Sequence, residues 1–365
     1  MIEFLSLKPK SFGLDFSDLS LRIAKLRKKG RFLSLSSWGE MKIKPGLIEE
    51  GEVKDEDRLA ENIKKSLNEV KGEKLKTKNV IASLSEEKAF LQVIQMPRME
   101  EGELKTALPF EAENYVPLPI EKVYLDFQIV PPVQDHLDHL DVLIAALPKK
   151  TVDPYLSCLK KAGLLPQALE IESQSISRAL VKNGVSPFPL FIIDFGKSRT
   201  SFIIFSGYSL RFTSSIPISS QKLTEAIAQT LKVDLTEAEE LKLKYGLVSK
   251  KTAENKKIIK AINPILADLV KEIKRYIAYY HSHSGHEHLP SEGSEINEIL
   301  LCGRGANLLG LTGFLSSELQ IPVKLGNPWV NILPEPLKEV PGLPFRESLG
   351  YTTVLGLALR GISDK

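Results

Sequence analysis

The feature that most constrains the fold of this chain is an internal repeat. The segment FGLDFSDLSLRIAKL at 12–26 aligns without a gap on FIIDFGKSRTSFIIF at 191–205, and Asp15 then meets Asp194. A β-like segment and a helical pattern follow each copy, at 31–41 and 55–70 in the first half and at 208–218 and 221–232 in the second. Such self-similarity predicts a duplicated α/β domain with a cleft between its halves.

The repeated acids indicate what this cleft binds. Each aspartate ends an apolar run and precedes a short polar turn, which is a hairpin signature. One such turn is ordinary loop chemistry, but two in equivalent places predict a shared site. Turn N–H groups and hydroxyls can surround a polyphosphate. Asp15 and Asp194 are then candidates to hold a hydrated Mg²⁺.

Composition excludes several classes of protein. The 365 residues are 42% hydrophobic and 26% charged, which is typical of globular domains, and a net charge of +3 does not indicate nucleic-acid binding. The two cysteines, Cys158 and Cys302, lie far apart and form no disulfide framework or metal motif. No apolar run approaches the length that spans a bilayer, and the first residues do not form a signal-peptide pattern. We therefore expect a cytoplasmic protein.

With these motifs the sequence resembles the actin-like superfamily of actin, Hsp70 and sugar kinases. The repeated turns resemble its two phosphate loops, QALEIESQSISRAL at 167–180 its connecting helix, and EILLCGRGANLLG at 298–310 its adenosine motif. Within the superfamily, residues 80–172 resemble the inserted segment of PilM-like type IV pilus assembly proteins.

This resemblance implies an α/β fold of duplicated actin-like, ribonuclease H-like domains around a nucleotide cleft, with an inserted α+β subdomain in the first half. The expected divisions are a first domain at 1–81, 165–187 and 345–365, an insertion at 82–164, a second domain at 188–234 and 294–344, and a helical subdomain at 235–293. The implied ligands are ATP and Mg²⁺. The implied nucleotide-binding residues are Asp15, Ser17, Asp18, Ser20, Arg22, Asp194, Gly196, Lys197, Ser198, Thr200, Glu239, Lys242, Gly303, Arg304 and Gly305.

The chain departs from the family pattern at positions that face phosphate or adenosine. The family commonly has glycine, lysine or a small neutral residue where this chain has Ser17, Asp18, Arg22, Ser219, Ser220 and Arg304. An extra carboxylate at Asp18 repels phosphate unless Mg²⁺ lies between them. Arg304 can pair with phosphate or stack on adenine, and it can equally fill the pocket. We therefore expect a site that binds ATP and hydrolyses it poorly, with Asp194 the acid for any catalysis.

The segment VDLTEAEELKLKYGL at 233–247 predicts a helix. Asp234 can serve as its N-cap, with Glu237 completing a capping box and Gly246 ending the last turn. The resemblance implies that Glu239 and Lys242 on this helix contact the nucleoside. A solvent-exposed face with charge pairs three residues apart is the alternative.

The insertion implies a partner. PilM-like proteins bind the short cytoplasmic tail of a PilN-like membrane protein, so this resemblance implies a scaffold at the inner face of the cytoplasmic membrane. An extended tail would lie between the first domain and the insertion. Asn114, Tyr115, Val116 and Pro117 follow a predicted helix and are the candidate peptide contacts.

Two other functions stay open. An FtsA-like division protein shares an insertion at this place and usually ends in an amphipathic helix, whereas this chain ends in LALRGISDK. A sugar-kinase-type phosphotransferase would need a sugar-binding motif, and none stands out.

The run HSHSGHEH at 281–288 contains four histidines and suggests a metal site by composition. The four do not form the i,i+4 pair of a helical zinc site, and no cysteines support them. We expect a polar loop.

Overall fold

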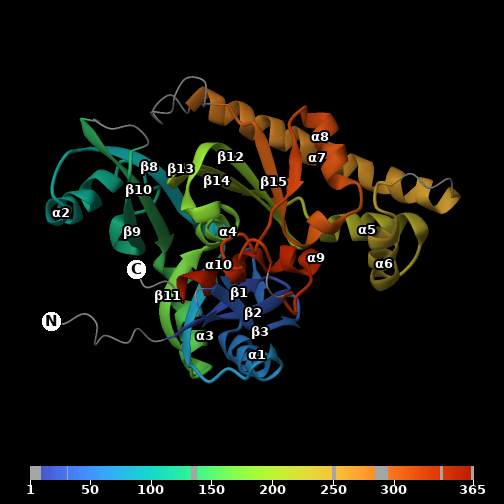
Figure 1. The fold of residues 1–365 in the computed structure, drawn as a ribbon, viewed down its shortest axis with the longest axis horizontal. Helices are drawn as coiled ribbons and strands as arrows, with labels where there is room; N and C mark the ends of the chain where they lie inside the picture. Colours follow the sequence, from blue (N-terminus) through green and yellow to red (C-terminus); the bar gives the residue numbers. More distant parts are fainter. Residues whose placement is uncertain are drawn as a thin grey trace.

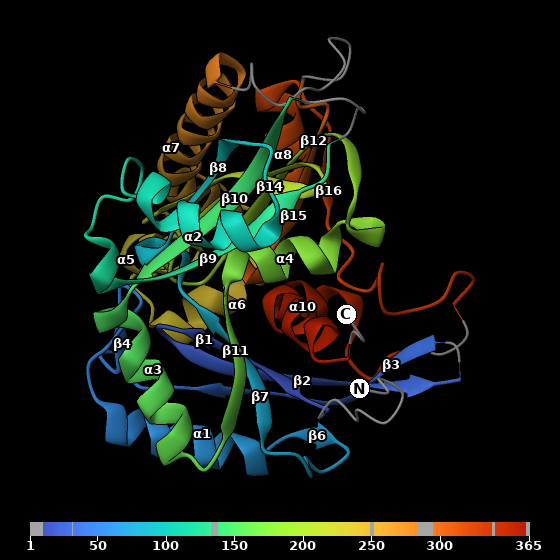
Figure 2. The same cartoon turned by 90° about the vertical axis from the view of Figure 1, so that its left-hand side faces the viewer.

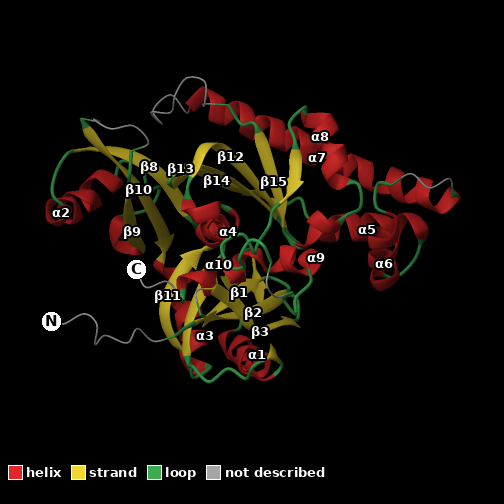
Figure 3. Cartoon of the chain, in the orientation of Figure 1, coloured by secondary structure: helices red, strands yellow, loops and turns green. Residues whose placement is uncertain are grey.

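The computed structural model describes residues 10–30, 32–132, 138–248, 252–283, 295–337 and 340–362. Two β-sheets lie one above the other with helices α4 (Glu172–Leu180) and α10 (Thr352–Arg360) between them, and further helices cover their outer faces (Figures 1 and 3). The first half of the chain forms the lower sheet and the second half forms the upper one. This is the layered α/β arrangement that the repeat predicts.

The lower sheet has the strand order β11-β7-β1-β2-β3-β6. Strands β1, β2 and β3 form an antiparallel meander, while β7 and β11 run parallel to β1. The bounds are β1 Phe12–Ser17, β2 Ser20–Lys29, β3 Phe32–Lys42, β6 Lys71–Gly72, β7 Asn79–Leu84 and β11 Leu165–Ile171. A two-stranded ribbon, β4 Ile48–Glu49 and β5 Glu52–Val53, follows β3.

The upper sheet repeats this topology. Its order is β14-β13-β12-β15-β16, with β12, β13 and β14 antiparallel and β15 and β16 parallel to β12. The bounds are β12 Ser186–Phe195, β13 Thr200–Gly207, β14 Ser209–Ile216, β15 Glu298–Cys302 and β16 Val323–Leu325. Strand for strand, β12 corresponds to β1, β13 to β2, β14 to β3, β15 to β7 and β16 to β11. The predicted duplication is therefore confirmed.

Helices pack on the sheets through apolar faces. Leu59 of α1 and Tyr155 of α3 are buried in one core with Phe12 of the lower sheet, and Ile262 and Ile273 of α7 are buried with the upper sheet. Figure 2 shows α4 and α10 side by side between the two sheets. The helix bounds are α1 Glu56–Asn68, α2 Glu101–Ala112, α3 Lys149–Lys161, α5 Ser220–Leu231, α6 Leu235–Tyr245, α7 Ala253–His283, α8 Leu311–Leu319 and α9 Phe345–Ser348.

The inserted segment forms a separate three-stranded antiparallel sheet in the order β8-β10-β9. One face packs on α2, and the other contacts α4 and the upper sheet. The bounds are β8 Phe90–Pro97, β9 Val123–Val130 and β10 His139–Pro148. The helix α2 ends at Ala112, so Asn114 to Pro117 follow a helix as expected.

The packing places three segments differently from the expected divisions. Strand β7 continues to Leu84 inside the lower sheet, so a boundary after residue 81 cuts a strand. Helix α3 packs with α1 in the lower core, which associates it with the first domain and not with the insertion. Helix α7, which the expected divisions place in the helical subdomain, packs along the upper sheet. We propose that the insertion spans roughly β8 to β10.

Candidate functional site

The two repeated turns meet in one cleft because parallel strands place their carboxyl ends at the same sheet edge. In the lower sheet β1 ends at this edge with Ser17, while β7 and β11 are followed there by Ser85 and Glu172. In the upper sheet β12 and β15 end at Phe195 and Cys302. Residues from both edges line a narrow cavity of about 60 Å³.

The first loop is internally bonded. Asp15 is buried and accepts a hydrogen bond of 2.9 Å from the Ser83 hydroxyl, and Arg22 lies 3.4 Å from its other oxygen. Burial raises the pKa of Asp15, and Arg22 and Ser83 offset only part of this. The Ser17 hydroxyl lies 3.0 Å from that of Ser20 and accepts from the Ser20 N–H. These two hydroxyls therefore serve first to close the turn.

The second loop carries Asp194, an acid whose pKa is raised in the folded protein. Burial, together with the charge of Asp15, raises the pKa of Asp194 to about 6. Gly303 is required beside it, because its φ is +84° and an added Cβ would lie 2.2 Å from Asp194 Oδ1. A Cβ at Gly305 would lie 2.5 Å from the ring of Phe195. The adenosine-like turn and the second phosphate-like loop are thus in direct contact.

Lys197 gives this loop its positive charge. The side chain is half-buried, and burial, with the nearby charges of Lys42 and Arg304, lowers its pKa. Gly196 holds the loop in a tight turn by donating its N–H to the Arg199 carbonyl oxygen at 2.9 Å. A cluster of cations at the end of this loop fits an anionic ligand.

Glu172, the first residue of α4, is a partly buried acid that sequence reasoning missed. It lines the cavity, and its pKa is well above the ordinary value because of burial and the charges of Asp15 and Asp194. It accepts from the Glu86 N–H at 3.3 Å, while Glu86 accepts from the Ser173 N–H at 3.2 Å. The position directly after a parallel strand was the available signal. The acid form of such a carboxyl can release a proton and its carboxylate form can accept one, which are the two roles of a general acid and a general base.

Ion pairs connect the two halves across the cleft. Arg304 of the upper half pairs with Glu40 of β3, and Arg199 pairs with Glu87 at 2.7 Å. Glu40 also pairs with Arg22 at 3.1 Å. The cavity volume of about 60 Å³ is far below the roughly 300–1,000 Å³ of ordinary small-molecule sites. A polyphosphate therefore requires the cleft to open further.

Glu239 and Lys242 form an internal pair near the cleft. Lys242 is buried and donates to the Ser220 hydroxyl at 2.7 Å and to the Thr224 hydroxyl at 2.8 Å, with Glu239 2.7 Å away. The pair joins α6 to the start of α5. The expected N-cap is confirmed, since Asp234 accepts from the Glu237 N–H and Gly246 follows the helix, whereas the bond from Glu237 back to Asp234 stays a prediction. The alternative prediction, a solvent-exposed charged face of this helix, is wrong at Lys242, because its side chain is buried.

Most of the nucleotide-binding residues expected from sequence lie around this cavity. The lining includes Asp15, Ser17, Asp18, Arg22, Asp194, Gly196, Lys197, Ser198, Gly303 and Arg304. The expected residues outside the lining are Ser20, Thr200, Glu239, Lys242 and Gly305. Thr200 is fully buried and donates its hydroxyl to the Ile218 carbonyl oxygen at 2.6 Å, so it holds the loop in place.

Donors and charges of the cleft fit a polyphosphate with a divalent cation. Arg22 is buried, and its Nε has no hydrogen-bond partner in the described structure. The side-chain ammonium group of Lys197 has no hydrogen-bond partner among the described residues. Asp15 and Asp194 have the oxygens that Mg²⁺ prefers. Among the described residues no group of three or more acids, histidines and cysteines is arranged to hold a metal directly. His281 and His283 belong to the end of α7, whereas His286 and His288 lie outside the described part of the chain.

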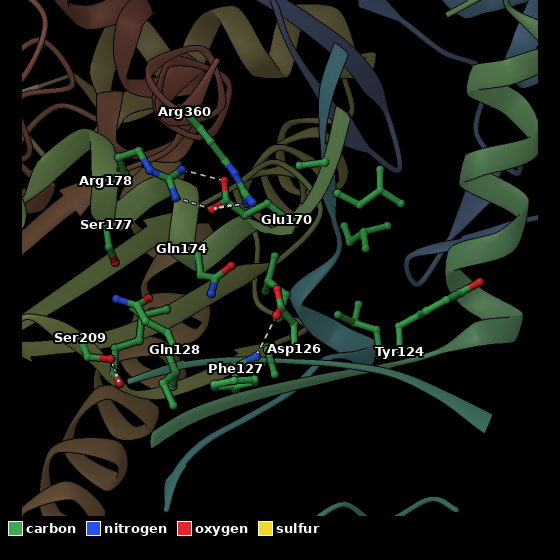
Figure 4. A pocket seen from close by; sticks show the side chains of 18 of the residues that line it. Tyr124, Asp126, Phe127, Gln128, Glu170, Gln174, Ser177, Arg178, Ser209 and Arg360 are labelled. Carbon is green, nitrogen blue, oxygen red and sulfur yellow. Dashed lines mark hydrogen bonds and ion pairs between the residues drawn. The ribbon is translucent and has the colours of Figure 1, made fainter. Parts of the chain in front are cut away.

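A larger groove of about 830 Å³ lies between the inserted sheet, the lower sheet and α4 (Figure 4). Five successive residues of β9, Tyr124 to Gln128, and six of β11, Pro166 to Ile171, line it. Both are edge strands of their sheets. Successive residues of a strand point to opposite faces, so a lining without gaps indicates that the strand edges themselves face the groove.

The groove wall contains charged and polar side chains (Figure 4). Glu170 is buried and pairs with Arg178 and, at 3.1 Å, with Arg360. The Ser177 hydroxyl is buried with no partner in the described structure, although this side chain belongs to the groove lining. An unpaired buried hydroxyl is unfavourable until a partner group reaches it.

The four residues predicted to contact a peptide lie elsewhere. None of Asn114, Tyr115, Val116 and Pro117 lines the groove. Val116 is buried in the core of the inserted sheet with Leu104 and Leu108, while Asn114 and Pro117 are exposed. This placement follows from the chain reversal after α2, which directs the apolar side chain inward.

The profile of the family described as type IV pilus assembly protein PilM matches residues 13–362. A solved structure of a PilM-PilN type IV pilus biogenesis complex is 27% identical, with a TM-score of 0.80, and covers 98% of this chain and 100% of that one. MreB5 of Spiroplasma citri bound to ADP has a TM-score of 0.52 at 12% identity, covering 94% of each chain, and supports the actin-like fold alone.

Curated relatives include the cell division protein FtsA of Pseudomonas aeruginosa, which is 24% identical over 225 residues, 57% of this chain and 50% of that protein. FtsA of Neisseria meningitidis is 22% identical over 55% of this chain and 49% of its own length. The chain thus spans about half the length of the curated relatives it matches. In the described residues no helix is both long and apolar enough to cross a membrane.

Proposed function

Because the chain belongs to the type IV pilus assembly protein PilM family, we propose that it is a scaffold of the pilus assembly platform whose groove binds the cytoplasmic tail of a PilN-like membrane protein. Such binding would hold the protein at the inner face of the cytoplasmic membrane. The observation that carries the proposal is the pair of unpaired strand edges, β9 and β11, that face one groove.

An extended peptide suits this groove better than a helix. A peptide strand can add to an exposed sheet edge through main-chain hydrogen bonds, with alternate side chains entering pockets on either side. The lining supplies an apolar surface for these side chains in Leu125, Leu143, Leu147, Val152, Leu156 and Leu169. Apolar residues at alternate positions of the tail would therefore bind.

Polar groups of the groove favour a ligand rich in amides. The side chains of Gln128 and Gln174 have no hydrogen-bond partner among the described residues, and Figure 4 shows both beside Ser177. A peptide backbone or an asparagine or glutamine side chain satisfies such groups with both donors and acceptors. The buried Glu170 is already neutralised by Arg178 and Arg360. We expect recognition by hydrogen bonding and apolar contact more than by charge.

The test is fluorescence anisotropy of a labelled synthetic peptide with the sequence of that tail. Ala168→Arg places a long charged side chain in the groove and should weaken binding by at least about tenfold, or 1.4 kcal/mol. Leu165→Arg is the matched control, because Leu165 is 56% exposed on the same strand and does not line the groove. Equal binding by both variants would refute the assignment of the groove.

We also propose that the cleft binds ATP with Mg²⁺. The support is the actin-like fold, the convergence of Asp15 and Asp194, and the cations Arg22, Lys197, Arg199 and Arg304 that line the cavity. Lys197 and Arg22 would bind phosphate oxygens, and the two aspartates would orient the waters of the hydrated Mg²⁺, which would offset charge on the phosphates. The ion pairs Arg304–Glu40 and Arg199–Glu87 hold the cleft closed, and the hydroxyls of Ser17 and Ser20 bond to each other. Both features favour slow ATP hydrolysis or none.

Isothermal titration with ATP and Mg²⁺ tests this second part. We expect binding that Asp194→Ala abolishes, because the variant removes an acid of the Mg²⁺ site. The control is Asp268→Ala on the exposed face of α7. Retention of full affinity by Asp194→Ala would contradict the proposed metal site.

A further inference from the structure

Glu40 bridges two arginines that come from opposite halves of the molecule. One carboxylate oxygen accepts from Arg22 Nη2 at 3.1 Å, and the other pairs with Arg304 Nη2. Arg22 lies on β2 of the lower sheet, whereas Arg304 follows β15 of the upper sheet. Both arginines line the phosphate cavity. The carboxylate therefore joins the two walls of the cleft.

Several cations lie near Glu40. The charges of Lys42, Arg304 and Glu40 act on the pKa of Lys197, so these groups lie close together. The charges of Glu40, Arg22 and Arg304 also act on the pKa of Tyr351. Glu40 is the acid that pairs with both Arg22 and Arg304, and such charge-assisted contacts are strong.

Two departures from the expected sequence pattern meet at this carboxylate. The pattern has lysine where this chain has Arg22 and glycine where it has Arg304. A guanidinium at each place can reach Glu40 from either side, which lysine and glycine could not do together. Arg22 and Arg304 therefore both bind the same carboxylate of Glu40.

We infer that Glu40 is a built-in anion that occupies the guanidinium groups of the cleft, holds its halves together without nucleotide, and sets a low affinity for nucleoside polyphosphates. A phosphate must displace the carboxylate from Arg22 and Arg304 before it binds there. This inference rests on the nucleotide part of the proposed function and is independent of the groove.

The test compares Glu40→Gln with the wild-type protein by isothermal titration with ATP and ADP in the presence of Mg²⁺. Glutamine keeps the size of the side chain and removes its charge. We expect affinity to rise by at least about tenfold, because two charge-assisted contacts no longer compete with phosphate. Glu73→Gln is the control, since Glu73 pairs with Arg27 on the exposed rim of the same sheet. An affinity that is unchanged or weaker in Glu40→Gln overturns the inference.

A second readout needs no nucleotide. Small-angle scattering of the ligand-free protein should give a larger radius of gyration for Glu40→Gln than for the wild type, and ATP should restore the smaller value. An unchanged radius would contradict the closing role of Glu40.

The outcomes separate the two proposals. Nucleotide binding by Glu40→Gln alone supports the inference and refutes nucleotide binding by the wild type. Equal binding by both proteins refutes the inference and leaves the proposed function intact. If neither protein binds nucleotide, the inference and the nucleotide part of the proposed function both fail.

Discussion

Gly356 of α10 lies directly against Ser175 of α4, so that an added Cβ would be 1.8 Å from the Ser175 carbonyl oxygen. Both helices reach from the cleft to the groove. Helix α4 places Glu172 in the cleft and Ser177 in the groove, and α10 places Thr353 in the cleft. Their contact therefore packs together two helices that each reach both candidate sites.

Gly356→Ala should destabilise the protein by about 1–3 kcal/mol, because the two helices must separate to admit a methyl group. Urea unfolding followed by circular dichroism measures this. Gly313→Ala is the matched control on α8, where a Cβ meets nothing within 4 Å. There the exchange should stabilise the helix by up to about 1 kcal/mol. A Gly356→Ala variant as stable as the wild type would disprove the close packing.

The pH dependence of stability should include a contribution from Asp194. Its pKa of about 6 in the folded protein exceeds the ordinary value of 3.8, so the folded state binds more protons than the unfolded state between these pH values. Stability from neutral Asp194 is full below about pH 4 and is lost as the pH rises through 6. Asp194→Asn should remove this loss and stabilise the ligand-free protein at pH 7 by at most about 3 kcal/mol.

Thermal unfolding between pH 4 and 8 checks the Asp194 prediction. Asp268→Asn, on the exposed face of α7, should follow the wild-type pH profile. An Asp194→Asn profile parallel to that of the wild type would show that Asp194 titrates normally.

Lys242→Met should destabilise the protein by about 3–5 kcal/mol even without nucleotide. The change leaves Glu239 without its 2.7 Å partner and Ser220 and Thr224 without a buried donor. Chemical unfolding measures the loss. Lys222→Met, on the exposed side of α5, should change stability by less than about 0.5 kcal/mol. Similar values for both variants would assign Lys242 to ligand binding alone.

The repeat predicted the shared strand order and the meeting of Asp15 with Asp194, because strand period and turn chemistry are local properties. Glu40 and Glu172 could not be predicted in the same way. Glu40 reaches Arg304 only because the two halves face each other, and the two residues are 264 positions apart in sequence. Thr200 was predicted to bind nucleotide, but its hydroxyl donates to the Ile218 carbonyl oxygen and does not line the cavity. The direction of this hydroxyl depends on a distant loop, which no local sequence pattern describes.

The groove illustrates the same limit. Its walls are the edges of β9 and β11, which belong to different sheets, and no periodicity in the sequence identifies an edge strand. The residues predicted to contact a peptide were chosen from a local pattern around Val116, which turned out to be an apolar core position. Pairing between distant strands decides where the groove lies.

Hydrogen–deuterium exchange with and without the synthetic PilN-like tail tests the central claim most directly. If the tail adds to the strand edges, amides of Val123–Val130 and Leu165–Ile171 should exchange more slowly when it is bound, because unpaired edge N–H groups gain acceptors. The edge strand β16, which lies at the opposite edge of the upper sheet from β14 and does not line the groove, should be unchanged. Binding of the tail without slower exchange in either β9 or β11 would contradict the proposed mode of recognition.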